Sequence, residues 1–210
     1  SHFQGLKNLL QILNLKKIKK FIQLGSSAEY GKILSPIKET ALCIPQTPYA
    51  IAKFLCTKYL MELHTEIKFP ATVFRLFQVY GPKQDDNRII PFLIKNCLKN
   101  KKFLTTEGKQ ICDFCYIDDV VNAIFKSINN KKTNGEILNI GSEKPISIKK
   151  VINLVLKKIG KGMPMLGGLN YKKSMNKNNF PNIDKAKKRL RWEPKISIDY
   201  GIVKTIESFK

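Results

Sequence analysis

The order of helical and strand-like segments in the first part of the chain most constrains its fold. Residues 6–13 carry Leu and Ile at helical spacing, and a compact apolar run follows at residues 20–24 (KFIQL). Residues 49–67 are typical of a long helix, and residues 71–79 (ATVFRLFQV) of a second buried strand. Helices that alternate with buried strands form crossover units whose strands run parallel. The pattern therefore predicts an α/β fold built on a parallel sheet.

The rest of the chain has shorter and less regular segments. Ser147 is a candidate N-cap and Gly160 a candidate stop for one amphipathic helix, and Asp118 and Asp119 are candidate caps for another. Residues 161–182 are rich in Asn and Lys, and we expect them to be irregular. Helices are expected at residues 91–98, 118–128, 147–159, 184–190 and 199–209, and strands at 135–141 and within 102–116.

The chain is strongly basic, with 38 Lys and Arg residues against 16 Asp and Glu residues and a net charge of +22. Such an excess is one signature of a polyanionic partner. Only four of these 38 residues are arginines, the side chain that recognises phosphates in a bidentate manner, and the lysines are spread along the whole sequence. We therefore predict a solvated lysine surface and no nucleic-acid partner, with a polyanion-binding module as the alternative.

The sequence also indicates in which cellular compartment the protein is expected. No apolar run approaches the roughly 18 residues of a membrane span, so we predict no membrane partner. The five cysteines lack the spacing of a disulfide framework, which favours a reducing compartment, the cytoplasm. No signal-peptide segment opens the sequence, and it begins with Ser1 rather than Met, so we expect a piece of a longer protein.

Tyr49 and Lys53 are the strongest candidates for chemistry. They are four residues apart on a predicted helix, so both side chains point to one face. An ammonium beside a phenol favours the phenolate and helps it to transfer a proton near neutral pH. Ser26 follows the first predicted strand, where an open parallel sheet presents residues at its carboxyl edge. The alternatives are a surface Tyr–Lys pair, and two serines, Ser26 and Ser27, that only cap a turn.

Other polar clusters have simpler explanations than chemistry. Cys112 and Cys115 form a lone Cys-x-x-Cys without nearby histidines, so we interpret them as two unrelated buried thiols rather than a metal or redox site. The acidic pairs at residues 85–86 and 118–119 are explained by solvated loops and helix capping. His64 is interpreted as a surface or interface residue. We therefore predict no metal site.

Several short motifs follow one another along the chain. They are residues 25–31 (GSSAEYG), 48–53 (PYAIAK), 75–82 (RLFQVYGP), 87–91 (NRIIP), 113–120 (DFCYIDDV), 139–141 (NIG), 184–187 (DKAK) and 192–194 (WEP). As an ordered set that spans nearly the whole chain, they resemble the extended short-chain dehydrogenase/reductases, and within these the nucleotide-sugar epimerase/dehydratase branch.

This resemblance implies a fold and a reaction. The fold is a Rossmann-like, doubly wound parallel sheet, its N-terminal part missing here, with a smaller mixed α/β substrate-binding domain. Residues 1–82 would be the second half of the NAD(P)-binding domain, and residues 83–210 mainly the substrate-binding region, with 118–141 returning to the first domain. The reaction is hydride transfer between NAD or NADP and a nucleotide-diphosphate sugar.

The resemblance also assigns roles to single residues. The catalytic residues by this match are Ser26, Tyr49 and Lys53. The cofactor-binding residues are Tyr49, Lys53 and Leu76. The substrate-binding residues are Ser27, Gln78, Arg88 and Lys172. Helices at residues 6–16 and 49–66 would form the interface of a homodimer.

Departures from the family pattern affect what the chain can bind. The Gly-x-x-Gly-x-x-Gly turn that binds dinucleotide phosphates is absent near the start of the sequence. Cys112 stands where the family usually has the arginine that anchors the diphosphate, and a thiol cannot form that charged fork. Gln78 replaces an Asn but keeps the amide, and His2 replaces an Asn near an expected turn at Gly5.

The reaction type follows from a further departure. Ser27 and Ala28 stand where sugar 4,6-dehydratases carry an Asp-Glu pair, so dehydration is not expected, and Glu29 is not given that role. The expected function is an NAD(P)-dependent nucleotide-sugar epimerase or 4-keto-sugar reductase. The alternative from another class is a catalytically inactive, truncated remnant of the family.

Overall fold

The alternation of helices and strands produces a parallel sheet in the computed structural model, which describes residues 2–170 and 176–209. Three strands, β1 (Phe21–Ser26), β2 (Ala71–Leu76) and β7 (Glu136–Ile140), pair in the order β1-β2-β7 and run parallel. The central strand, β2, is buried along almost its whole length, as expected for a parallel strand covered on both faces. The prediction of an α/β fold with a Rossmann-like parallel sheet is confirmed.

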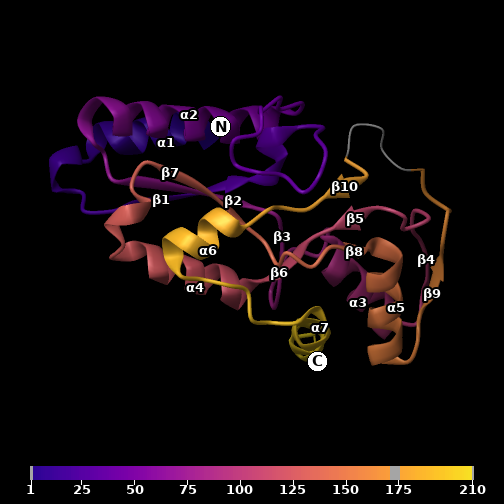
Figure 1. The fold of residues 1–210 in the computed structure, drawn as a ribbon. Coiled ribbons are helices and arrows are strands. Elements are labelled where there is room, and N and C mark those ends of the chain that lie inside the picture. The colour runs from indigo at the N-terminus through magenta and orange to yellow at the C-terminus, as the bar shows by residue number, and fades with distance from the viewer. Residues whose placement is uncertain (1, 171–175, 210) are drawn as a thin grey trace.

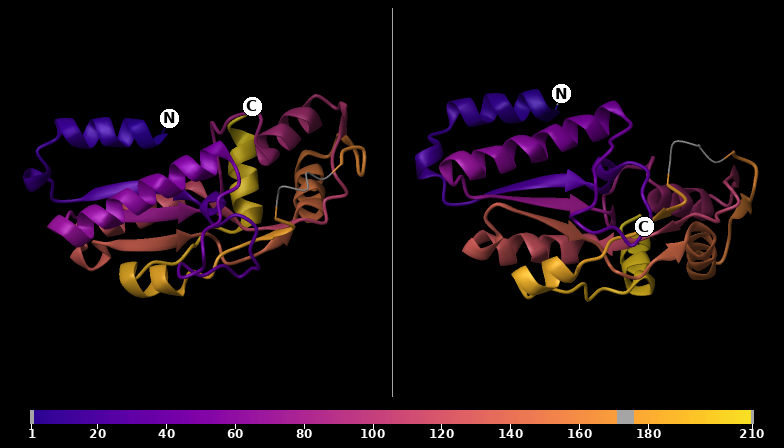
Figure 2. Two further views of the ribbon diagram at one scale, coloured as in Figure 1. Left: turned by 90° about the horizontal axis from the view of Figure 1, so that it is seen from above. Right: turned by 45° about the horizontal axis from the view of Figure 1, so that its top comes forward.

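Helices cover both faces of this sheet (Figures 1 and 2). On one face lie α1 (His2–Ile12) and α2 (Pro48–Ile67), and on the other lie α4 (Ile117–Ile128) and α6 (Asp184–Leu190). Adjacent residues of β2 point to opposite faces, so the side chain of Val73 packs with Leu60 of α2 while Phe74 packs with the α4 and α6 layer. The result is a three-layer α/β/α arrangement.

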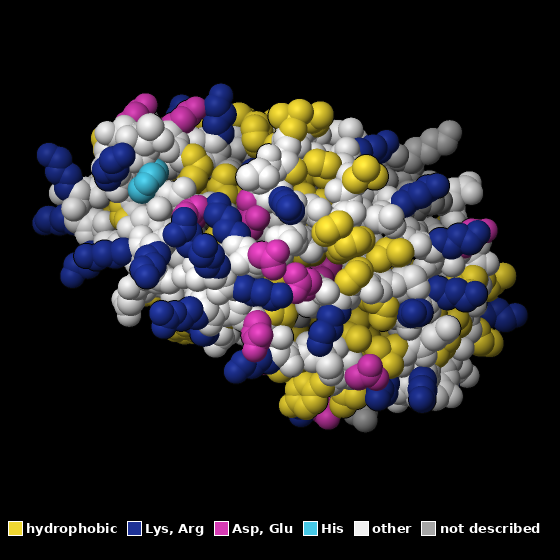
Figure 3. Space-filling model, viewed as in Figure 1, with side chains coloured by type: hydrophobic (Ala, Val, Ile, Leu, Met, Phe, Trp, Pro, Cys, Tyr) yellow, Lys and Arg dark blue, Asp and Glu magenta, His cyan; other side chains and the backbone are white. Residues whose placement is uncertain are grey.

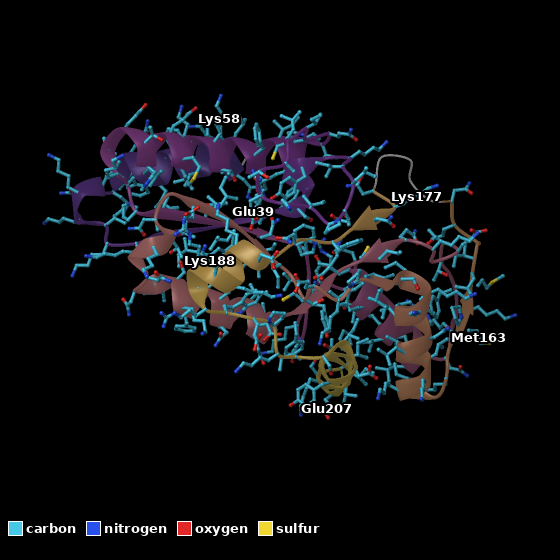
Figure 4. All side chains as sticks on the ribbon, in the orientation of Figure 1. Glu39, Lys58, Met163, Lys177, Lys188 and Glu207 are labelled. Carbon is cyan, nitrogen blue, oxygen red and sulfur yellow. The ribbon has the colours of Figure 1, made fainter. Side chains whose placement is uncertain are left out.

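The remaining elements form a second lobe of short strand pairs and helices, on the right in Figure 1, where Met163 also lies in Figure 4. Its strands pair as β3-β6, β10-β5-β8 and β4-β9. The strands are β3 (Gln78–Tyr80), β4 (Lys102–Leu104), β5 (Ile111–Cys112), β6 (Phe114–Tyr116), β8 (Ile146–Ser147), β9 (Met163–Met165) and β10 (Asn178–Asn179). The helices are α3 (Ile89–Leu98), α5 (Ile148–Ile159) and α7 (Ile198–Glu207), and their apolar faces share one core with β3 and β6.

Short 3₁₀ turns complete the chain: η1 (Leu15–Lys17), η2 (Ser27–Tyr30) and η3 (Lys131–Thr133). The helix predicted at residues 6–16 is therefore α1, which ends at Ile12, followed by the separate turn η1. The caps of α5 are as predicted: the Ser147 hydroxyl accepts the Lys150 N–H, and Gly160 ends the helix at a positive φ of 78°.

The single strand predicted at residues 71–79 is wrong, because the chain changes sheets at Phe77. β2 ends at Leu76, and the Phe77 N–H donates to the Ile140 oxygen at 3.1 Å. The next N–H, of Gln78, donates instead to the Asp113 oxygen at 3.1 Å and starts β3 beside β6. The apolar run is continuous because both sheets bury it, so hydrophobicity alone does not mark the break.

Two smaller expectations, for Gly5 and for residues 161–182, are also corrected, whereas His64 is partly exposed, in agreement with a surface or interface position. Gly5 lies inside α1, not in a turn. His64 is half-buried: its Nδ1 lies 2.8 Å from the Phe69 oxygen, and its ring fills the space beside Gly135, which has a positive φ of 74°. The stretch 161–182 is not wholly irregular, because it contains β9 and β10.

Asp118 and Asp119 do not cap α4, whose N-cap is Tyr116. The Asp119 carboxylate is buried and instead accepts the backbone N–H groups of Lys195 and Ile196, at 3.0 and 2.9 Å. The neighbouring Trp192 donates its indole N–H to the Asp119 backbone oxygen at 3.0 Å. Asp119 therefore fastens the segment between α6 and α7 to the first turn of α4.

Asp119→Ala is expected to lower the free energy of unfolding by about 2–3 kcal/mol, because it leaves two partly buried backbone donors without their carboxylate. The measurement is urea denaturation of the natural protein that contains this chain. Asp118→Ala is the matched control, since Asp118 is exposed on the same helical turn and should change stability by less than about 0.5 kcal/mol. Equal losses in the two variants would contradict the anchoring role of Asp119.

Candidate active site

The carboxyl ends of the parallel strands form the edge at which several predicted site residues lie. Ser26 is in register with Leu76, and Leu76 with Ile140, so the three residues end adjacent strands. Ser26 is the last residue of β1, whereas the sequence places it just past the strand. In an open parallel α/β sheet this edge is where ligands bind.

Ser26 is held in a defined orientation by the turn that follows it. The Ser26 oxygen accepts the Ala28 N–H at 3.2 Å, and a Glu29 carboxylate oxygen accepts the Ser26 N–H at 2.8 Å. Together these contacts form a capping box over η2. Because a hydroxyl has one proton and two acceptor positions, accepting the Ala28 N–H leaves the proton available for a further acceptor.

The first turns of α2 present Tyr49 and Lys53 together. The Thr47 hydroxyl caps the helix by accepting the Ala50 N–H at 3.1 Å, which places Tyr49 in the first turn. Tyr49 is 47% exposed, with the Lys53 Nζ 5.8 Å from its ring centroid. Lys53 donates to the Leu24 oxygen of β1 at 2.8 Å, so the cationic side chain reaches from α2 to the strand that ends in Ser26. The His2 ring packs edge-on against Tyr49 with centroids 5.6 Å apart.

Beneath this surface lies a buried polar network that sequence reasoning missed. The Glu29 carboxylate is inaccessible to solvent and forms an ion pair with Arg75 of β2, the Nε–Oε2 distance being 2.8 Å. The same oxygen accepts the Thr57 hydroxyl of α2 at 2.8 Å. Arg75 stands inside an otherwise apolar strand, and a buried charge requires a partner. That arginine was the sequence signal from which a buried acid could have been inferred.

The network continues on the other side of Arg75. Its guanidinium lies 4.5 Å from the centroid of the Tyr30 ring, and the Tyr30 hydroxyl donates to the Asn139 side chain at 2.7 Å. Burial raises the pKa of Tyr30 to about 12, so it stays a neutral donor at physiological pH. The motif residues Glu29, Tyr30, Arg75 and Asn139 thus form one connected structure.

The predicted diphosphate position, Cys112, lies on β5 between β8 and β10. Burial, and after it the Asp113 charge, raise the pKa of the Cys112 thiol to about 11, so this side chain is neutral near pH 7. Its partner in register on β10 is Asn179, whose amide donates to the Ser27 hydroxyl at 3.4 Å. β10 therefore connects the Ser26–Ser27 turn to the strand of Cys112, a link that the sequence did not indicate.

The remaining predicted substrate residues are more dispersed. Gln78 is half-buried at the start of β3, directly after the point where the chain leaves the first sheet. Arg88 is exposed at the N-cap of α3, and in the described part of the chain no hydrogen bond or ion pair joins its side chain to another residue. Lys172 lies outside the described residues.

Residues 2–170 and 176–209 contain neither a cluster of metal ligands nor a membrane-spanning helix. Within these ranges no group of three or more His, Cys, Asp and Glu residues is placed to hold a metal ion. Cys112 and Cys115 are both free thiols. No helix in the same ranges has the length and apolar character needed to cross a bilayer.

Comparison with known proteins gives consistent matches. Residues 1–141 match the model of the NAD-dependent epimerase/dehydratase family. A UDP-glucuronate 4-epimerase of Thermodesulfobacterium geofontis is 33% identical over 209 residues, which cover 98% of this chain and 64% of that protein. A human dTDP-D-glucose 4,6-dehydratase is 30% identical over 214 residues, covering 98% of this chain and 61% of that protein.

Among solved structures, a UDP-glucuronic acid 4-epimerase from Bacillus cereus, in complex with UDP-glucuronic acid and NAD, superposes with a TM-score of 0.90. It is 29% identical to this chain, and the match covers 99% of this chain and 67% of that one. The chain thus spans about two thirds of the length of the proteins to which it is similar.

Proposed function

The chain belongs to the NAD-dependent epimerase/dehydratase family, and from this we propose that it is the catalytic part of a nucleotide-sugar epimerase or 4-keto-sugar reductase. The observation that carries the proposal is the meeting of α2 and β1: Tyr49 and Lys53 share one helix face, and Lys53 contacts the strand that ends in Ser26. In this proposal Ser26, Tyr49 and Lys53 are the catalytic residues.

Each of the three groups has a task that its surroundings favour. Ser26, whose oxygen already accepts the Ala28 N–H, donates a hydrogen bond to a sugar oxygen and orients the sugar without losing its proton. Tyr49, half-exposed in the first turn of α2, takes or gives the proton of the sugar hydroxyl. Lys53 supplies a positive charge near the Tyr49 ring, its Nζ 5.8 Å from the ring centroid, and this charge stabilises negative charge that develops in the transition state.

NAD or NADP, when bound, would supply the hydride acceptor and donor. The residues present fit the nicotinamide end of such a cofactor, because Tyr49, Lys53 and the end of β2 at Leu76 lie at the carboxyl edge of the sheet. The outer edge of β1 has no strand partner among the described residues, and no glycine-rich turn precedes it in the sequence. Binding the cofactor phosphates would require such a turn beside β1.

Epimerisation or reduction fits the site better than dehydration does. Elimination of water would need an acid and a base that reach the sugar, and Ser27 and Ala28 provide neither. The carboxylate of the same turn, Glu29, is fully buried and paired with Arg75. We therefore propose a C4 epimerase or a 4-keto-sugar reductase, although one relative is named as a dehydratase.

We propose that the chain divides into a cofactor domain, built on the sheet β1-β2-β7, and a substrate-binding region. Residues 1–82 would belong to the cofactor domain and residues 83–210 mainly to the substrate region, with 118–141 in the first domain. In support, β7 pairs with β2, and α4 packs on the same sheet. Ser27, Gln78, Arg88 and Lys172 remain the proposed contacts with the nucleotide sugar.

The test is a conversion assay with the natural protein that contains these 210 residues, supplied with NAD, NADH or NADPH and a panel of UDP- and dTDP-sugars that includes their 4-keto forms. An epimerase would form the C4 epimer, seen by nuclear magnetic resonance, with no net change in NAD. A reductase would consume NADPH or NADH with a 4-keto sugar. No conversion of any member of the panel would contradict the proposal and favour an inactive remnant.

Cys112→Arg is expected to lower the substrate KM by about tenfold with little change in kcat, because a guanidinium at this position would form a bidentate pair with the diphosphate. Steady-state kinetics of the natural protein measures both constants. Cys112→Gln is the control, since it adds a polar side chain without charge and should leave KM near the wild-type value. An unchanged or raised KM in Cys112→Arg would place the diphosphate anchor elsewhere.

We also propose a homodimer through α1 and α2. Their surface exposes Leu9 and Ile12 of α1 and Ile51 of α2. A hollow of about 410 Å³ between α2 and the sheet is lined by both apolar and charged side chains, among them Phe54, Met61 and Glu62. Lys58, on the same side, is visible at the top of Figure 4. Sedimentation velocity is expected to show a dimer at micromolar concentration, and a monomer at all concentrations would contradict the interface.

A further inference from the structure

We propose that Glu29 is a positioning residue, whose buried carboxylate holds Ser26 and the Tyr49–Lys53 face of α2 in a fixed relation to each other. The proposal deepens the function proposed above and rests on it, since it concerns the groups that would act in hydride transfer. The observation behind it is that one carboxylate contacts three separate elements, namely β1, α2 and β2.

The first contact fixes the strand end. Glu29 Oε1 lies 2.8 Å from the Ser26 nitrogen, and a Cβ atom at residue 25 would lie 2.5 Å from the same oxygen. The carboxylate therefore folds back against Gly25, in a space that only glycine leaves open. Holding the Ser26 N–H in this way sets the backbone from which the Ser26 hydroxyl projects.

The second contact fixes the helix. Thr57 lies four residues after Lys53 and eight after Tyr49, so the three side chains are on one side of α2. The Thr57 hydroxyl donates to Glu29 Oε2 at 2.8 Å. The helix face that carries Tyr49 and Lys53 is thus fastened, two turns from Tyr49, to the group that holds Ser26.

The third contact explains why a charged group is tolerated there. Glu29 Oε2 also accepts the Arg75 Nε–H at 2.8 Å, with both side chains almost fully buried. A paired buried carboxylate accepts three hydrogen bonds without leaving an uncompensated charge. Since the carboxylate is inaccessible to solvent, Glu29 cannot touch the substrate, and its effect on the reaction must pass through Ser26 and α2.

Glu29→Gln tests this arrangement with almost no change of shape. Whichever way the amide is turned, its NH₂ group faces a donor, either the Ser26 N–H or the Arg75 Nε–H. One of these two hydrogen bonds is therefore lost. A misplacement of about 1 Å in an active site can cost about 10²-fold in rate. We therefore expect kcat to fall about 10²-fold, with substrate KM and the NAD dissociation constant changed less than about threefold.

Two further variants separate positioning from a general loss of structure. Glu39→Gln makes the same chemical change in a half-buried acid that accepts the Asn139 N–H at 2.9 Å. Among residues 2–170 and 176–209, no hydrogen bond or ion pair joins the Glu39 side chain to Ser26 or α2; Glu39 lies near the middle of the molecule in Figure 4. It should leave kcat within about threefold of wild type. Thr57→Val removes only the contact between α2 and Glu29 and should lower kcat about tenfold.

Kinetics and crystal structures of these variants of the natural protein decide the outcome. Displacement of Ser26 relative to Tyr49 in Glu29→Gln, together with a fall in kcat but not in binding, is the expected result. Wild-type kcat in Glu29→Gln, or unmoved Ser26 and Tyr49, would overturn the proposal. A wild-type protein that converts no nucleotide sugar would instead contradict the proposed function, and the displacement alone would then decide the role of Glu29.

Discussion

Tyr49→Phe is expected to lower kcat of the natural protein by about 10³-fold, because it removes the only group proposed to exchange a proton with the sugar hydroxyl. The substitution deletes one oxygen from a side chain that is 47% exposed, so the free energy of unfolding should change little. The Lys53 contact with the Leu24 oxygen does not involve the Tyr49 hydroxyl and should persist. Binding of NAD and substrate should therefore change little, while turnover is lost.

Tyr59→Phe is the matched control for this prediction. Tyr59 lies on the same helix but faces Phe3 of α1, with ring centroids 6.0 Å apart. Removing its hydroxyl should change kcat by less than about threefold. If Tyr49→Phe retained turnover within tenfold of wild type, Tyr49 would have no part in proton transfer. Loss of NAD binding in Tyr49→Phe would point to a structural cause.

The fold was predictable where local signals agree with tertiary packing. α5 has a capping serine, an amphipathic body and a glycine stop, and the structure has the helix within one residue of the predicted bounds. β1 and β2 were found from apolar runs flanked by helices. The end of β2 was not found, because Phe77, Val79 and Tyr80 are as apolar as the strand before them. Only pairing with β6, far along the chain, separates the two strands.

The candidate site residues that lie within short sequence motifs could be predicted from the sequence. Tyr49 and Lys53 follow from helical spacing, and Ser26 from its place after a strand. Glu29 and Thr57 were missed as a pair because 28 residues separate them and neither has a local signature. The positive charge of the chain is equally uninformative about the site: Lys and Arg are spread over the face shown in Figure 3, with Asp and Glu between them.

Arg75→Met is expected to produce the largest loss of stability, about 3–5 kcal/mol of unfolding free energy, because it leaves the Glu29 carboxylate buried without its counter-charge. The Arg75 side chain is 3% exposed and that of Glu29 0%, so water cannot replace the lost partner. The stacking of the guanidinium on Tyr30 is lost as well. Urea denaturation of the natural protein measures the effect as a shift of the unfolding midpoint.

Arg189→Met is the matched control, since Arg189 pairs with Glu136 at 2.7 Å but is 43% exposed. An exposed ion pair contributes little, so this variant should lose less than about 1 kcal/mol. The double variant Glu29→Gln, Arg75→Met should be more stable than Arg75→Met alone, because a neutral amide needs no counter-charge. A double variant more stable than Arg75→Met would show that the stability lost in Arg75→Met comes from the unpaired charge on Glu29. A double variant less stable than Arg75→Met would show that the loss comes from packing instead. If the double variant is more stable than Arg75→Met, the Glu29 carboxylate is a charged group that needs Arg75 of β2 as its counter-charge.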